Sequence, residues 1–157
     1  MEIAFRSLTD GEKRNGNTFV VPNNVTTIDD GVFAGCLFER IVLPSTVDKI
    51  ETNAFANCWR LKSLSIPPKV KVLKKGICAF CLNLENSEFP EGLELIEAGA
   101  FSNCPNLKQV EIPEVCEVEV GAFDEGCSVI FKEKLNEEKY HFSSTLTTSS
   151  EKTKELV

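Results

Sequence analysis

The chain has little histidine, no long apolar run and no excess of positive charge. A single histidine, His141, in 157 residues excludes most histidine-based catalytic triads and histidine-rich metal sites. No apolar segment approaches the roughly 20 residues that a membrane-spanning helix needs, so we expect no membrane span. Residues 1–17 contain several charges and no apolar signal-peptide core, and we expect no signal peptide. The net charge of −7 argues against nucleic acid as a partner.

The chain does contain an internal repeat, which prolines make visible. Five of the seven prolines occur at positions 22, 44, 67, 90 and 113, at intervals of 22, 23, 23 and 23 residues. An alternating apolar segment precedes each proline, and three kinds of residue follow it at fixed distances. The sixth residue after the proline is aliphatic, the eleventh is phenylalanine in all units but one, and the fourteenth is cysteine. In the first four units these residues are Ile28, Ile50, Leu73 and Ile96; Phe33, Phe55, Cys78 and Phe101; and Cys36, Cys58, Cys81 and Cys104.

A repeat of this length predicts a stack of similar turns. One turn of about 23 residues cannot bury its own apolar side chains, whereas stacked turns share a continuous core. The period and the alternating Leu61-x-x-Leu64-x-Ile66 segment are typical of a leucine-rich-repeat solenoid. We therefore expect a strand-dominated α/β solenoid of about five turns. It forms a short, open, right-handed arc with parallel strands on its concave face.

Two longer patterns carry a resemblance to a known family. They are Leu61-x-x-Leu64-x-Ile66-Pro67-x-x-Val70-x-x-Leu73 and Val47-x-x-Ile50-x-x-x-Ala54-Phe55-x-x-Cys58-x-x-Leu61. Both resemble the BspA-type leucine-rich repeat, which occurs in bacterial surface proteins and in protozoan protein families. The resemblance implies protein partners and a role in adhesion or host contact as a surface antigen.

The same pattern divides the chain into three parts. Residues 1–18 are expected to form an N-terminal cap, and residues 19–131 the repeat domain. A fifth, irregular unit lies within that domain, and its last strand is expected at residues 129–131. Residues 132–157 are rich in Ser, Thr, Lys and Glu and are expected to be a polar tail, with a short helix at most followed by flexible chain.

The seven cysteines are the main candidates for chemistry. Those at the fourteenth position form one inward column with Cys127, where free cysteine packs as a small hydrophobe. Cys78 and Cys81 form a C-x-x-C pair, and Cys116 lies outside the column. These three are the candidates for a thiol redox or metal-binding function. Because packing already explains the C-x-x-C pair, we predict no catalytic residue, no cofactor and no metal ligand.

Two surfaces are candidates for binding. One is the concave face, formed by outward side chains of the expected strands: Arg40, Val42, Ser63, Ser65, Asn86, Glu88, Gln109 and Glu111. The other is a basic band, because all six charged residues from position 52 to position 84 are basic: Arg60, Lys62, Lys69, Lys71, Lys74 and Lys75. An acidic stretch follows it, so a partner of mixed charge is a possible ligand for this region.

The sequence therefore predicts a monomeric, non-catalytic module that binds other proteins. The lack of a recognisable signal peptide or anchor indicates the cytoplasm, whereas the family resemblance indicates the cell surface. An intracellular scaffold or adaptor is the first alternative. A thiol redox or metal-binding protein that uses Cys78, Cys81 or Cys116 is the alternative from another class.

Overall fold

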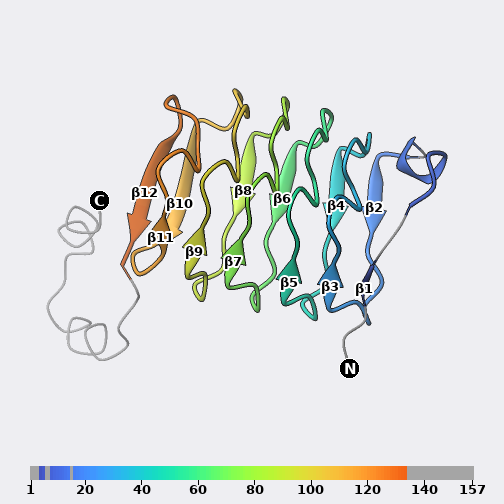
Figure 1. Cartoon of the computed structure of the whole chain (residues 1–157), viewed down its shortest axis with the longest axis horizontal. Coiled ribbons are helices and arrows are strands. Elements are labelled where there is room, and N and C mark those ends of the chain that lie inside the picture. Colours follow the sequence, from blue (N-terminus) through green and yellow to red (C-terminus); the bar gives the residue numbers. More distant parts are fainter. Residues whose placement is uncertain (1–3, 6–7, 15, 134–157) are drawn as a thin grey trace, which may run out of the picture.

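The computed structural model describes residues 4–5, 8–14 and 16–133, which form a solenoid of parallel strands (Figure 1). Two-residue strands alternate along the chain with longer ones. The two-residue strands are β1 (Ala4–Phe5), β3 (Thr27–Ile28), β5 (Lys49–Ile50), β7 (Val72–Leu73), β9 (Leu95–Ile96) and β11 (Glu117–Val118). The longer strands are β2 (Thr18–Val20), β4 (Arg40–Val42), β6 (Ser63–Ser65), β8 (Asn86–Glu88), β10 (Gln109–Pro113) and β12 (Ser128–Lys132). A 3₁₀ helix, η1 (Glu12–Arg14), lies between β1 and β2.

Each turn contributes one strand to each of two opposite sides of the solenoid. The longer strands pair in the orders β2-β4-β6-β8 and β10-β12, and β10 lies beside β8. The short strands pair in the orders β1-β3-β5 and β7-β9-β11, and β5 lies beside β7. The registered pairs of strands are all parallel. The predicted leucine-rich-repeat solenoid is confirmed.

The solenoid has six turns where the sequence predicts about five. The additional turn consists of β1, η1 and β2, and it precedes the first complete proline-marked unit. Its short strand stacks on the next turn, because Phe5 pairs with Ile28 and its ring stacks on Phe33 at a centroid distance of 5.4 Å. This first turn has no cysteine or A-F-x-x-C signature, which explains why the period alone does not reveal it. At the other end, β12 contains the expected last strand, and most of the expected tail, residues 134–157, lies outside the described residues.

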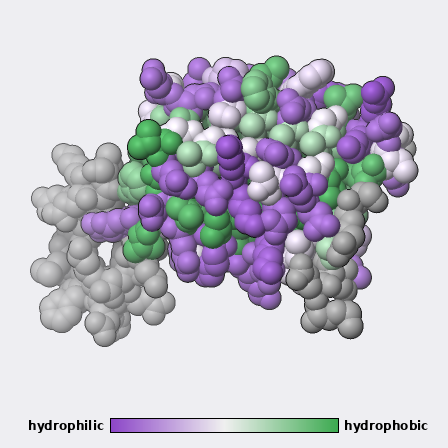
Figure 2. Space-filling model, viewed as in Figure 1, coloured by the Kyte–Doolittle hydropathy of each residue, from purple (hydrophilic) through white to green (hydrophobic). Residues whose placement is uncertain are grey.

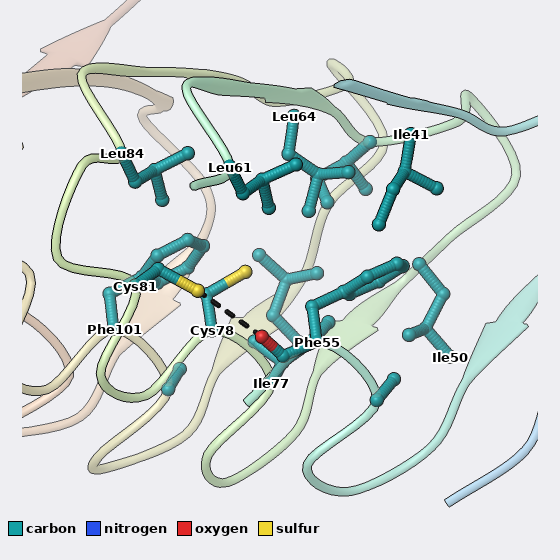
Figure 3. Packing of buried hydrophobic residues seen from close by; sticks show 14 of the residues in the cluster. Ile41, Ile50, Phe55, Leu61, Leu64, Ile77, Cys78, Cys81, Leu84 and Phe101 are labelled. Atoms are coloured by element: carbon teal, nitrogen blue, oxygen red, sulfur yellow. Dashed lines mark hydrogen bonds between the residues drawn. The ribbon is translucent and has the colours of Figure 1, made fainter. Parts of the chain in front are cut away.

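The core consists of columns of like side chains, as the period predicts. Ile28 pairs with Ile50, and Leu73 pairs with Ile96. The buried rings of Phe33 and Phe55 stack at 5.4 Å with an interplanar angle of 11°. A second stack joins Phe101 and Phe123 at 5.0 Å and 12°. Between the two stacks lies Cys78, which occupies the phenylalanine position of its turn (Figure 3).

The cysteine column is also present, and its thiols bind the backbone of the preceding turn. The Cys58 thiol donates to the Phe33 carbonyl at 3.0 Å. The Cys81 thiol donates to the Phe55 carbonyl at 3.2 Å, as Figure 3 shows. The Cys104 thiol donates to the Cys78 carbonyl at 3.0 Å. Cys127 in the last turn is only half-buried. Each of these bonds links one turn to the next inside the core.

Two left-handed residues shape the tight corner between the short and the longer strand. The first of them is Gly31, Asn53, Gly76, Gly99 or Gly121, depending on the turn. The second is Gly35, Asn57, Phe80 or Asn103, with φ values between 59° and 73°. Glycine and asparagine are the residues that tolerate this conformation best. The short A-F-x-x-C segments therefore form turns, in agreement with the tight corner that we expect from their length.

Candidate interaction surfaces

The eight residues predicted for the concave face lie on one side of the solenoid, which we call the strand face. Arg40 pairs with Ser63, and Ser63 pairs with Asn86 in the next turn. Ser65 pairs with Glu88, so the second outward position is also aligned. Because neighbouring strands are about 4.8 Å apart, these side chains form two rows at a regular spacing.

Several strand-face side chains bind one another across turns. The Ser65 hydroxyl donates to the Glu88 carboxylate at 3.3 Å. Glu111 forms an ion pair with Lys132 at 2.6 Å between charged atoms. Val42 is exposed beside Val20, with which it is in register. The face therefore changes along the solenoid, from apolar near β2 and β4 to polar near β8 and β10.

The structure places the six residues of the basic band on two different sides. Arg60 and Lys62 lie between the corner and β6, whereas Lys69, Lys71, Lys74 and Lys75 flank β7. β6 and β7 belong to opposite sides of the turn (Figure 1). Lys74 forms an ion pair with Glu51 of the preceding turn. The sequence alone does not reveal this division, because it depends on where the chain reverses direction.

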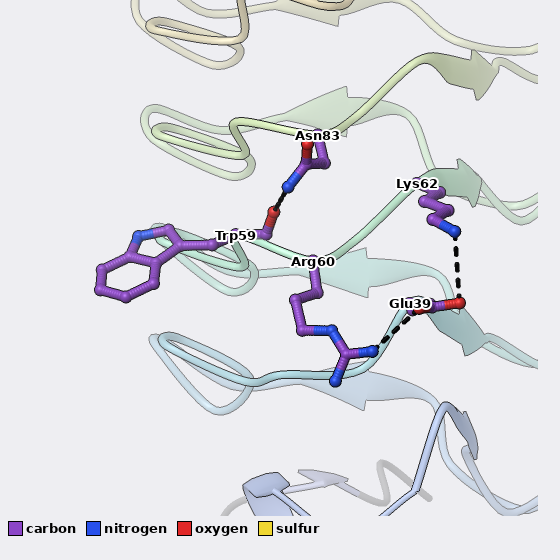
Figure 4. A network of polar contacts seen from close by, with 5 residues as sticks. All are labelled: Glu39, Trp59, Arg60, Lys62 and Asn83. Carbon is purple, nitrogen blue, oxygen red and sulfur yellow. Dashed lines mark hydrogen bonds and ion pairs between the residues drawn. The ribbon is translucent and has the colours of Figure 1, made fainter.

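Arg60 and Lys62 share one acidic partner, Glu39, which lies in the preceding turn (Figure 4). The Arg60 guanidinium donates to Glu39 Oε1 at 2.9 Å, and Lys62 Nζ lies 3.5 Å from Oε2. The hydrogen bond from Arg60, followed by the charge of Lys62, lowers the pKa of the Glu39 carboxyl. The group is at the surface, so this network contributes little to stability.

The three cysteines considered for chemistry are buried in the structure. Burial raises the pKa of the Cys78 thiol and raises that of Cys116 to about 11. Hydrogen bonds with the Cys58 and Cys78 thiols lower the pKa of Cys81, but Cys81 is buried and its thiol is directed at the Phe55 carbonyl. A reactive thiol needs exposure and a nearby positive charge or helix N-terminus. The surroundings of these residues are those of packing cysteines.

Within residues 4–5, 8–14 and 16–133, no group of three or more His, Cys, Asp or Glu side chains is arranged to hold a metal ion. Over the same residues, no helix has the length and apolar character that a membrane crossing requires.

A third surface, which the sequence analysis did not identify, lies at the corners before β6 and β8. Trp59, Phe80 and Leu82 are 55%, 47% and 42% exposed. We call these three residues the corner patch. Figure 2 shows hydrophobic side chains at the upper edge of the molecule, over these corners, on a face that is largely hydrophilic. The sequence feature that could have revealed this surface is Phe80, which occupies the position where the other turns have glycine or asparagine.

The stacked parallel turns, the buried columns and the outward rows of side chains define a leucine-rich-repeat solenoid protein. The family model described as "BspA type Leucine rich repeat region" matches residues 12–130 in six copies. The chain belongs to this family, as its sequence patterns predict. A comparison with curated proteins found no match.

Two solved bacterial structures have a similar fold. One is a leucine-rich repeat protein from Bacteroides ovatus ATCC 8483, with 23% identity and a TM-score of 0.58 over 76% of this chain and 37% of that one. The other is a leucine rich cell surface protein from Faecalibacterium prausnitzii A2-165, with 22% identity and a TM-score of 0.57 over 74% of this chain and 38% of that one. The chain thus spans less than two fifths of the length of either protein. Repeats of this family and fold are typically non-catalytic and mediate protein interactions.

Proposed function

We propose that this protein is a non-catalytic, monomeric module that binds another protein through its strand face. The observation that carries this proposal is the registered row of outward side chains, in which Arg40, Ser63 and Asn86 occupy successive turns. A row of this kind offers an extended surface whose chemistry changes at each turn while its spacing stays constant. The polar side chains supply hydrogen bonds, and the Val20–Val42 pair supplies apolar area.

Two settings are compatible with this function. The resemblance to BspA-type proteins and the description of one similar structure as a cell surface protein support adhesion or host contact. An intracellular scaffold that uses the same strand face is the alternative. Protease protection of the protein in fractionated cells distinguishes them, because only a surface protein is digested in intact cells.

The proposal is tested by quantitative cross-linking of the wild-type protein to its partners in its own cells. Ser63→Arg and Asn86→Arg place long charged side chains in the row and should abolish the captured species. Lys71→Glu and Lys75→Glu are the matched charge-changing controls on the β7 side and should leave capture unchanged. If partners are still captured by Ser63→Arg and Asn86→Arg but not by Lys71→Glu and Lys75→Glu, binding would be assigned to the β7 side. Light scattering of the purified protein gives its molar mass and tests whether it is monomeric.

The alternative of another class, a thiol redox or metal protein, predicts a rapidly reacting thiol or stoichiometric zinc. Burial of Cys78, Cys81 and Cys116 supports the interaction module instead. Metal analysis of the purified protein separates the two classes, since the module should carry no metal in fixed proportion.

A further inference from the structure

We propose that the strand face binds a basic segment of its partner protein, with an apolar side chain of that segment over Val20 and Val42 and a lysine or arginine over Glu88. The inference gives the chemistry of the partner and rests on the proposed function. It depends on three observations: an apolar pair at one end of a row of outward side chains, an exposed carboxylate two turns further along, and the net charge of the chain.

The residues concerned form the second outward row of the strand face, which consists of Val20, Val42, Ser65, Glu88 and Glu111. Val20 is in register with Val42, and Ser65 is in register with Glu88. Because β4 pairs with β6, Ser65 follows Val42 in the row, and β10 lies beside β8. Neighbouring strands are about 4.8 Å apart, so Val42 and Glu88 lie about 10 Å apart on the same face.

A partner segment that crosses the strands can contact both ends of this interval. In the polyproline II conformation a chain has three residues per turn, so side chains three residues apart point the same way at a separation of about 9 Å. This separation agrees with that of Val42 and Glu88. We therefore expect an apolar residue and a basic residue three positions apart in the segment.

The apolar end of the row is exposed although the fold does not require apolar residues there. Val20 and Val42 are 63% and 42% exposed. The next two turns have Ser65 and Glu88 at the equivalent position, so the strand geometry accepts polar side chains. An aliphatic or aromatic side chain that covers both valines removes apolar area from water, which is favourable in proportion to that area.

The acidic end of the row carries charge that a partner can neutralise. Glu88 is exposed and accepts a hydrogen bond from the uncharged Ser65 hydroxyl at 3.3 Å. Among the lysines and arginines that the structure describes, none forms an ion pair with Glu88. The adjacent carboxylate, Glu111, pairs with Lys132. A lysine or arginine of the partner above Glu88 would therefore supply a charge that the described part of the chain does not.

Other charges favour the same arrangement. Arg40 lies on β4 together with Val42, so it repels a base at the apolar end and directs the base of the segment towards Glu88. The net charge of −7 attracts a basic segment at long range. The same net charge repels a second copy of this chain, which is therefore a poorer match.

The test selects a displayed library of random short peptides on the intact protein. Fluorescently labelled synthetic copies of the enriched peptides are then titrated with the protein, and fluorescence anisotropy gives the dissociation constant. We expect the enriched peptides to be basic, with a lysine or arginine three residues from an aliphatic or aromatic residue. Replacing that base with glutamate, or the apolar residue with serine, should each weaken binding at least about fivefold.

Glu88→Gln is the first decisive variant, because it removes the charge and keeps the size of the side chain. It should weaken peptide binding about fivefold and make binding less sensitive to salt. Glu119→Gln removes the same charge from an exposed position next to β11, on the opposite side, and should leave binding unchanged.

Val42→Thr is the second decisive variant, because it keeps the shape of the side chain and makes it polar. It should also weaken peptide binding about fivefold. Its matched control is Val120→Thr, which makes the same change at an exposed valine next to β11 and should leave binding unchanged.

Enriched peptides that are neutral or acidic would overturn the inference, and so would peptides that bind Glu88→Gln as tightly as the wild type, or a library that yields no saturable binder. Equal losses in Glu88→Gln and Glu119→Gln would also overturn it, because general attraction to an acidic chain would then explain the binding. A concentration-dependent dimer that disappears in Glu88→Gln would replace the basic segment with a second copy.

Capture of partners in cells separates this inference from the proposed function. If Ser63→Arg loses the captured partner and Glu88→Gln retains it, the strand face binds a partner of different chemistry and only the inference fails. If capture survives in Ser63→Arg, the proposed function fails, and the inference fails with it.

Discussion

The phenylalanine column gives the sharpest prediction for stability, through Phe55→Ala. Phe55 is fully buried and stacks on Phe33 at 5.4 Å. On its other side lies the turn of Cys78, so removal of the ring leaves a space with no aromatic neighbour on that side to fill it. A phenylalanine buries at least about 150 Å², and at about 25 cal/mol per Å² the transfer contribution is about 4 kcal/mol. Measured costs of this substitution in protein cores, about 3–5 kcal/mol, agree with that value.

A loss of this size is a large part of the roughly 5–15 kcal/mol that stabilises a typical domain. With a urea dependence of about 2 kcal/mol per molar, the unfolding midpoint of Phe55→Ala should fall by about 2 M. Circular dichroism and Trp59 fluorescence should report the same transition, which tests whether the short solenoid unfolds as one unit.

Phe80→Asn is the matched control, because it removes a phenylalanine ring from an exposed corner position, two residues beyond the inward position of its turn. Its free energy of unfolding should not decrease, and relief of the left-handed conformation should raise it by about 1 kcal/mol. A loss of less than about 1 kcal/mol in Phe55→Ala, or equal losses in the two variants, would refute the division into inward and outward phenylalanines.

Three further predictions concern the corners, the thiols and the surface charges. Gly76→Ala should lower the free energy of unfolding in urea by about 1–2 kcal/mol. The φ of Gly76 is 70°, and a Cβ there would lie 2.0 Å from the side-chain oxygen of Asn53 in the preceding turn. Gly126→Ala is the control and should leave the free energy of unfolding unchanged, because a Cβ at Gly126 meets open space. Thiol reagents at pH 8 should label the native protein at least a hundredfold more slowly than the unfolded chain, because burial blocks access to the thiols and raises the pKa of every cysteine except Cys81, that of Cys104 to about 12; one fast native thiol would contradict this. Arg60 lowers the pKa of Glu39 below its ordinary 4.5, so the stability that this carboxylate contributes is present above pH 4.5 and is lost as pH falls through its folded-state pKa. The wild type should therefore be slightly more stable than Glu39→Gln at pH 7, and this difference should vanish in acid, whereas a constant difference at all pH values would show that the pair is not ionic.

The period of the sequence was sufficient to predict the fold and the composition of the core. Stacking turns of equal length forces equivalent residues into columns, so Ile28 and Ile50 had to meet once the solenoid was inferred. The outward row of Ser63 and Asn86 followed from the alternation of side chains along a strand. These features depend only on spacing, which the sequence states directly.

Other features depend on backbone conformation at single residues and could not be predicted from spacing. The additional first turn lacks the marker residues of the repeat, and only the pairing of Phe5 with Ile28 reveals it. The basic band divides because the chain reverses direction between Lys62 and Lys69. The exposure and the left-handed φ of Phe80 come from the structure, because the sequence pattern shows only that a phenylalanine stands where other turns have glycine or asparagine.

The turn that contains β7 and β8 departs from the repeat at two positions that are best considered together. At the inward position, where two stacks of rings flank it, the turn has Cys78 and forgoes the aromatic packing of Phe55 and Phe101. Two residues later, where its neighbours have asparagine, it has Phe80 in a strained and half-exposed conformation. Both departures act against folding stability, and together they move the only phenylalanine of the corner from the core to the surface. Stability of the solenoid alone favours the opposite arrangement, with the ring inward and asparagine at the left-handed position. The double change Cys78→Phe with Phe80→Asn restores the pattern of the neighbouring turns, and its midpoint of urea unfolding should be at least that of the wild type if the inward position has room for the ring.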